Sequence, residues 1–304
     1  MDKLVLVIVC LVLGIALRRS RAIPEHGALV LNKFVICVSL PAVIIHYVHA
    51  MDFAAFNTAQ LLAPVTLPWL LFFGAWGLML VIGRWRRWHP HTIACLTLCA
   101  GLGNTSFVGF PLIEALTGPE GLPTAVLLDQ LGTFLVMSIA GVGLASWYAG
   151  NKPDLLQLLK KVMRFPPFVA LILALVTQPF ELPPMLQTLL LELGATLVPL
   201  ALTAVGMQLI VSREILRLQW RSLAAGLGYK LLLAPLAFYL LYGAFMDTTS
   251  LPFRVLILEA AMAPMVTAGI IATDYKLRPE LGALMVGIGI PLSLVTVPLI
   301  NLLL

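Results

Sequence analysis

The feature that most constrains this chain is a series of apolar segments, joined by short and mostly basic loops. About 20 apolar residues in a helix cross the hydrocarbon core of a bilayer. Charged residues make up 11% of the chain, against about a quarter in soluble domains. We therefore predict an all-α polytopic membrane protein with ten transmembrane helices. The ten segments are residues 4–18, 27–48, 61–83, 91–117, 122–148, 165–179, 184–211, 220–245, 253–273 and 280–303.

The basic residues lie mainly in the loops after odd-numbered segments: Arg18, Arg19, Arg21, Arg84, Arg86, Arg87, Lys152, Lys160, Lys161, Arg164, Arg213, Arg217, Arg221, Lys276 and Arg278. Because cytoplasmic loops are enriched in Lys and Arg, we predict a multi-pass protein of the inner membrane with both termini on the periplasmic side. The lipid bilayer, and not nucleic acid, explains the net charge of +5. The first segment lacks a signal-peptide cleavage site, so we interpret it as a span; a signal anchor is the alternative.

The chain divides into two halves of five segments each. The loop 150–164 is the longest and most polar. It separates a first repeat, residues 1–149, from a second repeat, residues 165–304. Five is an odd number, so tandem copies must have opposite orientations in the membrane. We therefore expect two inverted five-helix repeats, an architecture of many secondary transporters.

Two pairs of helix-disrupting positions share one offset between the halves. Pro41 in segment 2 and Pro199 in segment 7 lie 158 residues apart, and the same offset carries Ser106 in segment 4 onto Pro264 in segment 9. Proline removes a backbone donor and disrupts a helix. We predict that segments 4 and 9 are broken helices that cross; the alternative is that these prolines only kink helices for packing.

Segment 4 contains an unusual number of residues that disrupt a membrane helix. Around the polar triplet Asn104, Thr105 and Ser106 lie Gly101, Gly103, Gly109 and Pro111. Lipid offers no partner for freed backbone groups, so such a break is tolerated only where it faces protein or a water-filled cavity. The N-termini of half-helices carry unpaired N–H groups and the positive end of the helix dipole. Together they predict a mid-membrane site for a carboxylate or another anion.

Four motifs resemble the auxin efflux carrier family in its bacterial branch. They are "LNKFVICVSLPA" from Leu31, "GLGNTSFVGFPLIEAL" from Gly101, "LVPLALTAVGMQL" from Leu197 and "EAAMAPMVTAGIIATDY" from Glu259. The resemblance covers nearly the whole chain. It implies a fold similar to that of bile-acid sodium symporters, with spans 1, 2, 6 and 7 as a scaffold and spans 3–5 and 8–10 as a moving transport domain.

The resemblance also implies a substrate site at the crossing of segments 4 and 9 and organic anions such as auxin, malonate and malate as substrates. We therefore expect the substrate-binding residues Asn104, Thr105, Ser106, Met262, Ala263, Pro264, Met265 and Ser39. Plant relatives carry an Asn beside the proline in both crossings, whereas Met262 and Ala263 precede Pro264 here. This difference argues against an indole acid and favours a small carboxylate.

Three ionisable residues lie well inside the predicted spans. Asp129, Glu259 and Lys230 are expensive to bury in a membrane, so each is a candidate for coupling to H⁺ or Na⁺. For Asp129 and Glu259 a structural role is an equal alternative. Lys230 has either a paired or a substrate-facing role, and one hypothesis is that it pairs with a carboxylate of the transport domain. His46, His49 and Asp52 are spaced for one helix face at the end of segment 2, and an interfacial helix end explains them better than a metal.

These observations predict a secondary transporter for small organic anions that works by alternating access. We find no nucleophile–base pair or metal motif, and expect no enzyme activity and no cofactor beyond a coupling ion. The alternatives are a receptor with a transporter fold that senses a carboxylate, and a sodium-coupled symporter of a bile-acid-like anion. Whether the protein forms a homodimer is left open.

Overall fold

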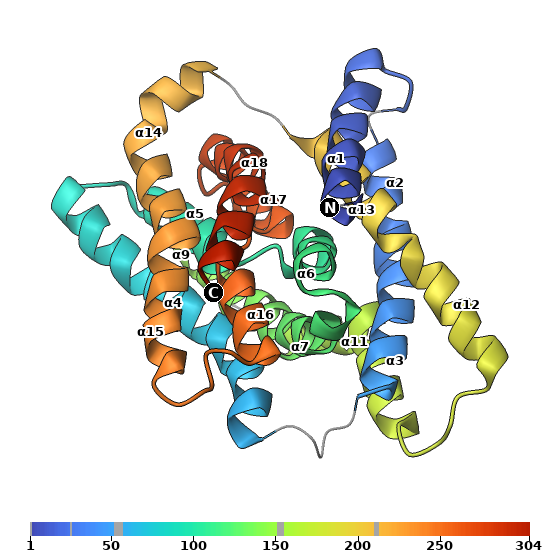
Figure 1. Cartoon of the computed structure of the whole chain (residues 1–304). Helices are drawn as coiled ribbons and strands as arrows, with labels where there is room; N and C mark the ends of the chain where they lie inside the picture. Colours follow the sequence, from blue (N-terminus) through green and yellow to red (C-terminus); the bar gives the residue numbers. More distant parts are fainter. Residues whose placement is uncertain (1, 25, 52–56, 151–154, 210–212) are drawn as a thin grey trace.

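The computed structural model describes residues 2–24, 26–51, 57–150, 155–209 and 213–304 (Figure 1). Its regular structure is helical, and one isolated antiparallel bridge joins Gly103 to Pro264. The α-helices of the first half are α1 Asp2–Ser20, α2 Gly27–Phe34, α3 Leu40–His49, α4 Thr58–Arg86, α5 Pro90–Gly101, α6 Phe110–Thr117, α7 Leu122–Leu127, α8 Phe134–Val136 and α9 Val142–Tyr148. After α10 Leu155–Met163 follow α11 Pro166–Thr177, α12 Pro184–Ala195, α13 Leu197–Gln208, α14 Arg213–Gly228, α15 Ala234–Gly243, α16 Leu251–Ala260, α17 Val266–Asp274 and α18 Pro279–Leu303.

Several neighbouring helices join into continuous membrane-length rods. Within the described part of the chain, six helices are long and apolar enough to cross a membrane: Gly27–His49, Thr58–Arg86, Pro119–Tyr148, Pro184–Gln208, Glu214–Gly243 and Pro279–Leu303. Shorter apolar helices cover Thr105–Thr117 and Pro166–Thr177. Many leucine and valine side chains on these helices are exposed, as expected where lipid covers a protein.

The helices pack in two groups (Figure 1). In one group α1 and α2 pack on α13, and α3 packs on α11 and α12. In the other, α4 and α5 pack together, and α14, α17 and α18 pack around α5 and one another. The short helix α6 contacts both α1 and α16. The segments that interrupt the membrane helices therefore lie between the two groups.

Helices α1 and α13 approach unusually closely at two glycines. A Cβ added at Gly14 would lie 2.1 Å from the carbonyl oxygen of Thr203, and one added at Gly206 would lie 2.2 Å from that of Leu11. Small residues allow membrane helices to pack backbone against backbone. This contact holds the N-terminal helix on the core of the first group.

We expect Gly14→Ala to destabilise the protein because the new methyl group meets backbone that cannot move aside. The cost of such overpacking is about 3 kcal/mol, which corresponds to a fall in Tm of about 5–10 °C. The matched control is Gly77→Ala in α4, where an added Cβ has no atom within 4 Å. That control should leave Tm unchanged or raise it, and equal losses in both variants would contradict the close contact.

The chain leaves the helical conformation at two positions inside apolar helices. Helix α5 ends at Gly101, and a π-helical turn begins at Thr105 and continues into α6. In the second half α16 ends at Ala260 and α17 begins at Val266. Pro111 lies inside α6, after the interruption. The departures from helix therefore fall on residues 102–104 and 261–265.

The other two prolines expected to break helices differ from each other. Pro41 follows the π-helical turn Val35–Ser39, and the rod continues into α3, so the helix is modified there but not broken. Pro199 lies in the first turn of α13, which is separated from α12 by a turn at Thr196. A π-helical turn accommodates an extra residue while the helix continues. The positions of prolines in the sequence do not predict such a turn.

Part of the loop 150–164 is helical. Residues Leu155–Met163 form the helix α10, which contacts the second π-helical turn of the rod Pro119–Tyr148 and the start of α11. The expected linker is thus largely a short amphipathic helix.

Candidate functional site

The two interruptions pair with each other through their backbones. The N–H of Asn104 donates to the carbonyl of Ala263 at 2.8 Å, and the N–H of Met265 donates to the carbonyl of Leu102 at 3.0 Å. These bonds flank the antiparallel bridge between Gly103 and Pro264. Because an extended segment inside a membrane must find backbone partners within the protein, each interruption satisfies the other.

Two half-helices begin beside this pairing. In the first half-helix, the N–H of Gly109 donates a hydrogen bond to the carbonyl of Asn104 at 2.9 Å, and this is the earliest such bond. In the second, the N–H groups of Ala268 and Gly269 reach back to the carbonyl of Met265. The amides of the preceding residues in each half-helix lie at its open N-terminal end, where partial positive charge accumulates.

Asp129 accepts the hydroxyls of the polar triplet. Its Oδ1 accepts hydrogen bonds from Thr105 Oγ1 and, at 2.6 Å, from Ser106 Oγ. Gln130 Nε2 donates a hydrogen bond to Oδ2 at 2.6 Å. All four side chains are buried. Thr105 and Ser106, which we expected to contact substrate, therefore hold a buried carboxylate beside the break.

Glu259 lies in the last turn of α16, directly before the second interruption. A Cβ added at Gly109 would lie 2.8 and 2.9 Å from its two carboxylate oxygens, so the carboxylate packs on the backbone of the facing half-helix. Both oxygens are buried and have no hydrogen-bond partner among the residues that the structure describes. Burying a carboxylate without a partner is costly, which indicates that a proton, a cation or a ligand completes this group.

Lys230 reaches the same region from the rod Glu214–Gly243. It is fully buried, and its Nζ donates to the carbonyl of Ala260 at 3.0 Å, at the C-terminal end of α16. A Cβ added at Gly103 would lie 3.0 Å from Nζ, so Gly103 leaves space for the ammonium group. The hydrogen-bond partner of Lys230 is thus a backbone carbonyl, whereas one of our hypotheses was a carboxylate partner.

Asn104 provides a polar group without a partner at the bridge itself. Its side chain is buried, and Nδ2 has no hydrogen-bond partner within the described ranges. A buried amide donor of this kind costs about 1–3 kcal/mol unless it is satisfied. It is therefore a candidate contact for a bound ligand.

The remaining expected residues lie around this centre in different roles. Met262 and Ala263 are fully buried, and Met265 packs on the core around α4 and α5. Ser39 pairs with Thr196 through their hydroxyls at 2.7 Å. Since Thr196 Oγ1 also donates to the carbonyl of Leu193, Ser39 is the donor, and its hydroxyl links α3 to the α12–α13 turn.

Three π-helical turns carry polar side chains of the centre, and the sequence analysis did not predict these turns. These turns are Thr105–Gly109, Leu128–Thr133 with Asp129, and Tyr229–Leu233 with Lys230. A π-helical turn shifts the side-chain register locally and occurs often at functional sites. The only sequence signal was a charged or polar residue deep inside an apolar span.

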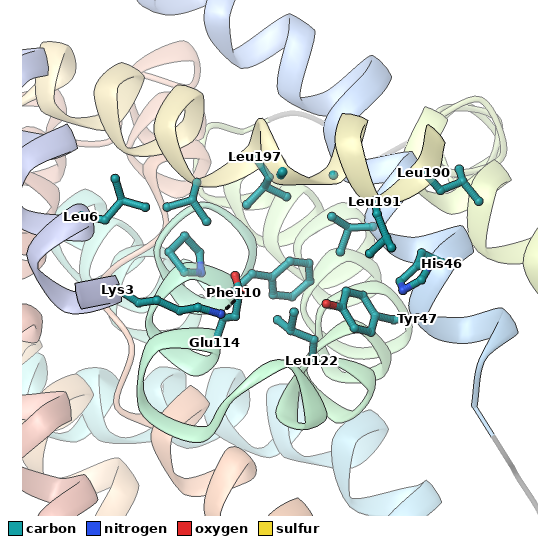
Figure 2. A pocket seen from close by; sticks show the side chains of 15 residues that line it. Lys3, Leu6, His46, Tyr47, Phe110, Glu114, Leu122, Leu190, Leu191 and Leu197 are labelled. Carbon is teal, nitrogen blue, oxygen red and sulfur yellow. Dashed lines mark hydrogen bonds and ion pairs between the residues drawn. The ribbon is translucent and has the colours of Figure 1, made fainter. Parts of the chain in front are cut away.

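Two cavities open on opposite sides of this centre. The larger, of about 820 Å³, is lined by Arg18 and Arg21 next to the basic loops and reaches Val266, the first residue of α17. The smaller, of about 250 Å³, lies among α1, α3, α6 and α13, and its lining includes Phe110 and Pro111 of α6 (Figure 2). The larger cavity lies between the two groups of helices, and the smaller cavity lies between the first group and the short helices α6 and α7.

An ion pair lies at the edge of the smaller cavity. Lys3 Nζ at the start of α1 contacts Glu114 Oε1 of α6 at 2.7 Å (Figure 2). His46 lines the other end of this cavity. His49 is the last residue of α3, and its buried Nδ1 has no hydrogen-bond partner among the residues described. Asp52 lies outside the described residues, and no group of His, Cys, Asp and Glu within them is arranged to hold a metal ion.

Comparison with known proteins defines the class of this chain. The family model described as membrane transport protein matches residues 1–301. The chain therefore belongs to this family, the auxin efflux carrier family. It is a multi-pass membrane transporter and not an enzyme.

Two archaeal proteins are similar over their whole length. An uncharacterized transporter of Methanothermobacter thermautotrophicus is 27% identical over 299 residues, which cover 96% of this chain and 94% of the relative. An uncharacterized transporter of Methanocaldococcus jannaschii is 24% identical over 311 residues, covering 98% of this chain and 97% of the relative.

Proposed function

We propose that the protein is a secondary carrier for small organic anions such as malonate or malate. The observation that carries this proposal is the pairing of two interrupted helices, which places two half-helix N-termini together with Asn104 Nδ2, a donor that has no partner within the described part of the chain. A carboxylate is the ligand that such amide groups and helix dipoles prefer. Thr105 and Ser106 contribute by fixing Asp129 next to the anion.

The charges at the centre support coupling to a cation. Asp129 and Glu259 are two buried carboxylates, and Lys230 is one buried ammonium group. An entering anion adds further negative charge, so a proton or a sodium ion that enters with it lowers the electrostatic cost. Glu259, whose oxygens have no hydrogen-bond partner among the described residues, is the preferred carrier of that cation.

The arrangement of the two cavities supports alternating access. The inverted repeats form a scaffold of spans 1, 2, 6 and 7 and a transport domain of spans 3–5 and 8–10, which slide past each other. The structure then corresponds to a state open toward the basic, cytoplasmic side, where the larger cavity lies. The Lys3–Glu114 pair joins the scaffold helix α1 to α6 and closes the opposite, periplasmic side.

The direct test is counterflow of labelled malonate or malate in proteoliposomes, run with and without sodium and with and without a proton gradient. We expect internal unlabelled substrate to drive uptake of the label, with a dependence on one of the two cations. Binding without exchange would instead support a receptor. Exchange of bile-acid-like anions alone, with strict sodium dependence, would support the symporter.

Glu114→Gln should open the periplasmic side more often. An exposed ion pair contributes up to about 1 kcal/mol, which is a change of about fivefold in the ratio of the two states. A cysteine placed at Ala195, which lines the smaller cavity, should therefore react several times faster with a membrane-impermeant thiol reagent. The charge-reversed pair Lys3→Glu with Glu114→Lys should restore slow labelling; fast labelling in this double variant would contradict a gating role.

A further inference from the structure

We propose that α10 lies in the surface of the bilayer and binds anionic phospholipid headgroups through Lys160 and Arg164. This helix joins the last span of the first repeat to the first span of the second. Its nine residues extend over about 14 Å, too short to cross a membrane. It packs on the π-helical turn Met137–Gly141 and on α11.

The side chains of α10 that the structure describes include three adjoining faces at the period of 3.6 residues per turn. Val162 is 3% exposed and faces the protein. Next to it lie Leu159 and Met163, which are 55% and 51% exposed, and Leu156, which is 61% exposed. Beyond this apolar stripe lies Lys160, exposed to solvent, with exposed Arg164 directly after the helix.

The depth of α10 matches the edge of the hydrocarbon layer. Asp129 is bonded to Thr105 at the interruption, which the proposed carrier places at mid-membrane. The turn Met137–Gly141, on which α10 packs, lies 8–12 residues further along the same rod, or about 12–18 Å. Half of the hydrocarbon core is about 15 Å. Trp147, near the end of this rod, is exposed, as is common for tryptophan at the membrane–water interface.

Charge identifies the lipid that this surface prefers. The segment 150–164 contains Lys152, Lys160, Lys161 and Arg164 but only one acidic residue, Asp154. An amphipathic helix with an apolar stripe beside basic residues lies in the interface plane and attracts anionic lipids. Each basic residue close to such a surface strengthens binding by about fivefold. The partner is thus a leaflet that contains anionic phospholipid, on the side of the basic loops.

Site-directed spin labels on the full chain in lipid nanodiscs test the orientation of α10. The background is Cys37→Ser, which removes the exposed native thiol. Labels at Leu159→Cys and Met163→Cys should be more accessible to oxygen than to a water-soluble nickel reagent, and a label at Lys160→Cys should show the reverse. Equal access of the nickel reagent at all three positions would overturn the proposal, because the stripe would then face water.

Lipid dependence tests the basic residues separately from transport. Nanodiscs of phosphatidylcholine with increasing phosphatidylglycerol should raise the Tm of the unmodified protein. In the double variant Lys160→Gln, Arg164→Gln, the rise in Tm should be largely lost, because about fivefold in binding is removed with each of the two basic residues. The matched control Arg217→Gln removes an exposed charge from α14 and should keep the original response. An unchanged response in the double variant, or an equal loss in the control, would overturn the assignment of Lys160 and Arg164.

Discussion

Asn104→Ala is expected to abolish transport while leaving the fold intact. The Nδ2 group of Asn104 has no hydrogen-bond partner in the described part of the chain, so its removal costs the protein no internal bond. A hydrogen bond to a charged ligand contributes about 1.5–3 kcal/mol, and its loss should weaken anion binding about 10- to 100-fold. Counterflow in proteoliposomes measures the transport, and thermal unfolding measures the stability.

A matched control distinguishes a ligand contact from general damage to the same membrane segment. Thr97 lies on α5, is fully buried, and bonds the carbonyl of Ile93 in its own helix at 2.9 Å. Thr97→Ala should transport normally with a slightly lower Tm. If Asn104→Ala also transports normally, the anion binds elsewhere; if its Tm falls sharply, Asn104 has a structural role.

Single substitutions that reverse one buried charge should have the second large effect. Lys230→Glu places three carboxylates around the interruptions, and Glu259→Lys places two ammonium groups beside Ala260. Leaving a buried charge without its counter-charge costs about 3–5 kcal/mol, so each single variant should lose transport and at least about 6 °C in Tm. Detergent-purified protein gives Tm, and proteoliposomes give transport.

Double variants test whether the charges of Lys230 and Glu259 compensate each other and whether they couple transport to a cation. Lys230→Glu combined with Glu259→Lys should restore stability and part of the transport if the two groups compensate each other. Lys230→Met combined with Glu259→Gln removes both charges and should fold, but its anion exchange should no longer respond to a proton or sodium gradient. Failure of the reversed pair to recover either property would reject charge compensation between Lys230 and Glu259. Retained coupling in the neutral pair would exclude Glu259 as the site of the coupling cation.

Much of the candidate site could be found from the sequence because membranes make polar residues conspicuous. A run of Asn104, Thr105 and Ser106 between glycines cannot be explained by lipid, and the same holds for Asp129, Lys230 and Glu259 deep in apolar spans. The cost of burying such groups in hydrocarbon makes each of them visible without any knowledge of the fold.

The hydrogen-bond partners of these polar residues could not be predicted from the sequence. We expected Thr105 and Ser106 to face a substrate, but they donate to Asp129, and Lys230 bonds the carbonyl of Ala260. These contacts join residues far apart in the sequence, and they depend on π-helical turns that change the side-chain register by one residue. Pro41 shows the same effect, because it follows such a turn within a continuous helix.

The sequence by itself determined that the chain crosses a membrane many times and where two of its apolar helices are interrupted. Hydrophobic length, loop charge and helix-breaking residues are local properties, so they can be read along the chain. Only the tertiary structure decided that residues 102–104 pair with residues 263–265, and which polar groups are left without partners. Hydrogen bonding across the chain depends on the packing of whole helices, and no local pattern specifies it.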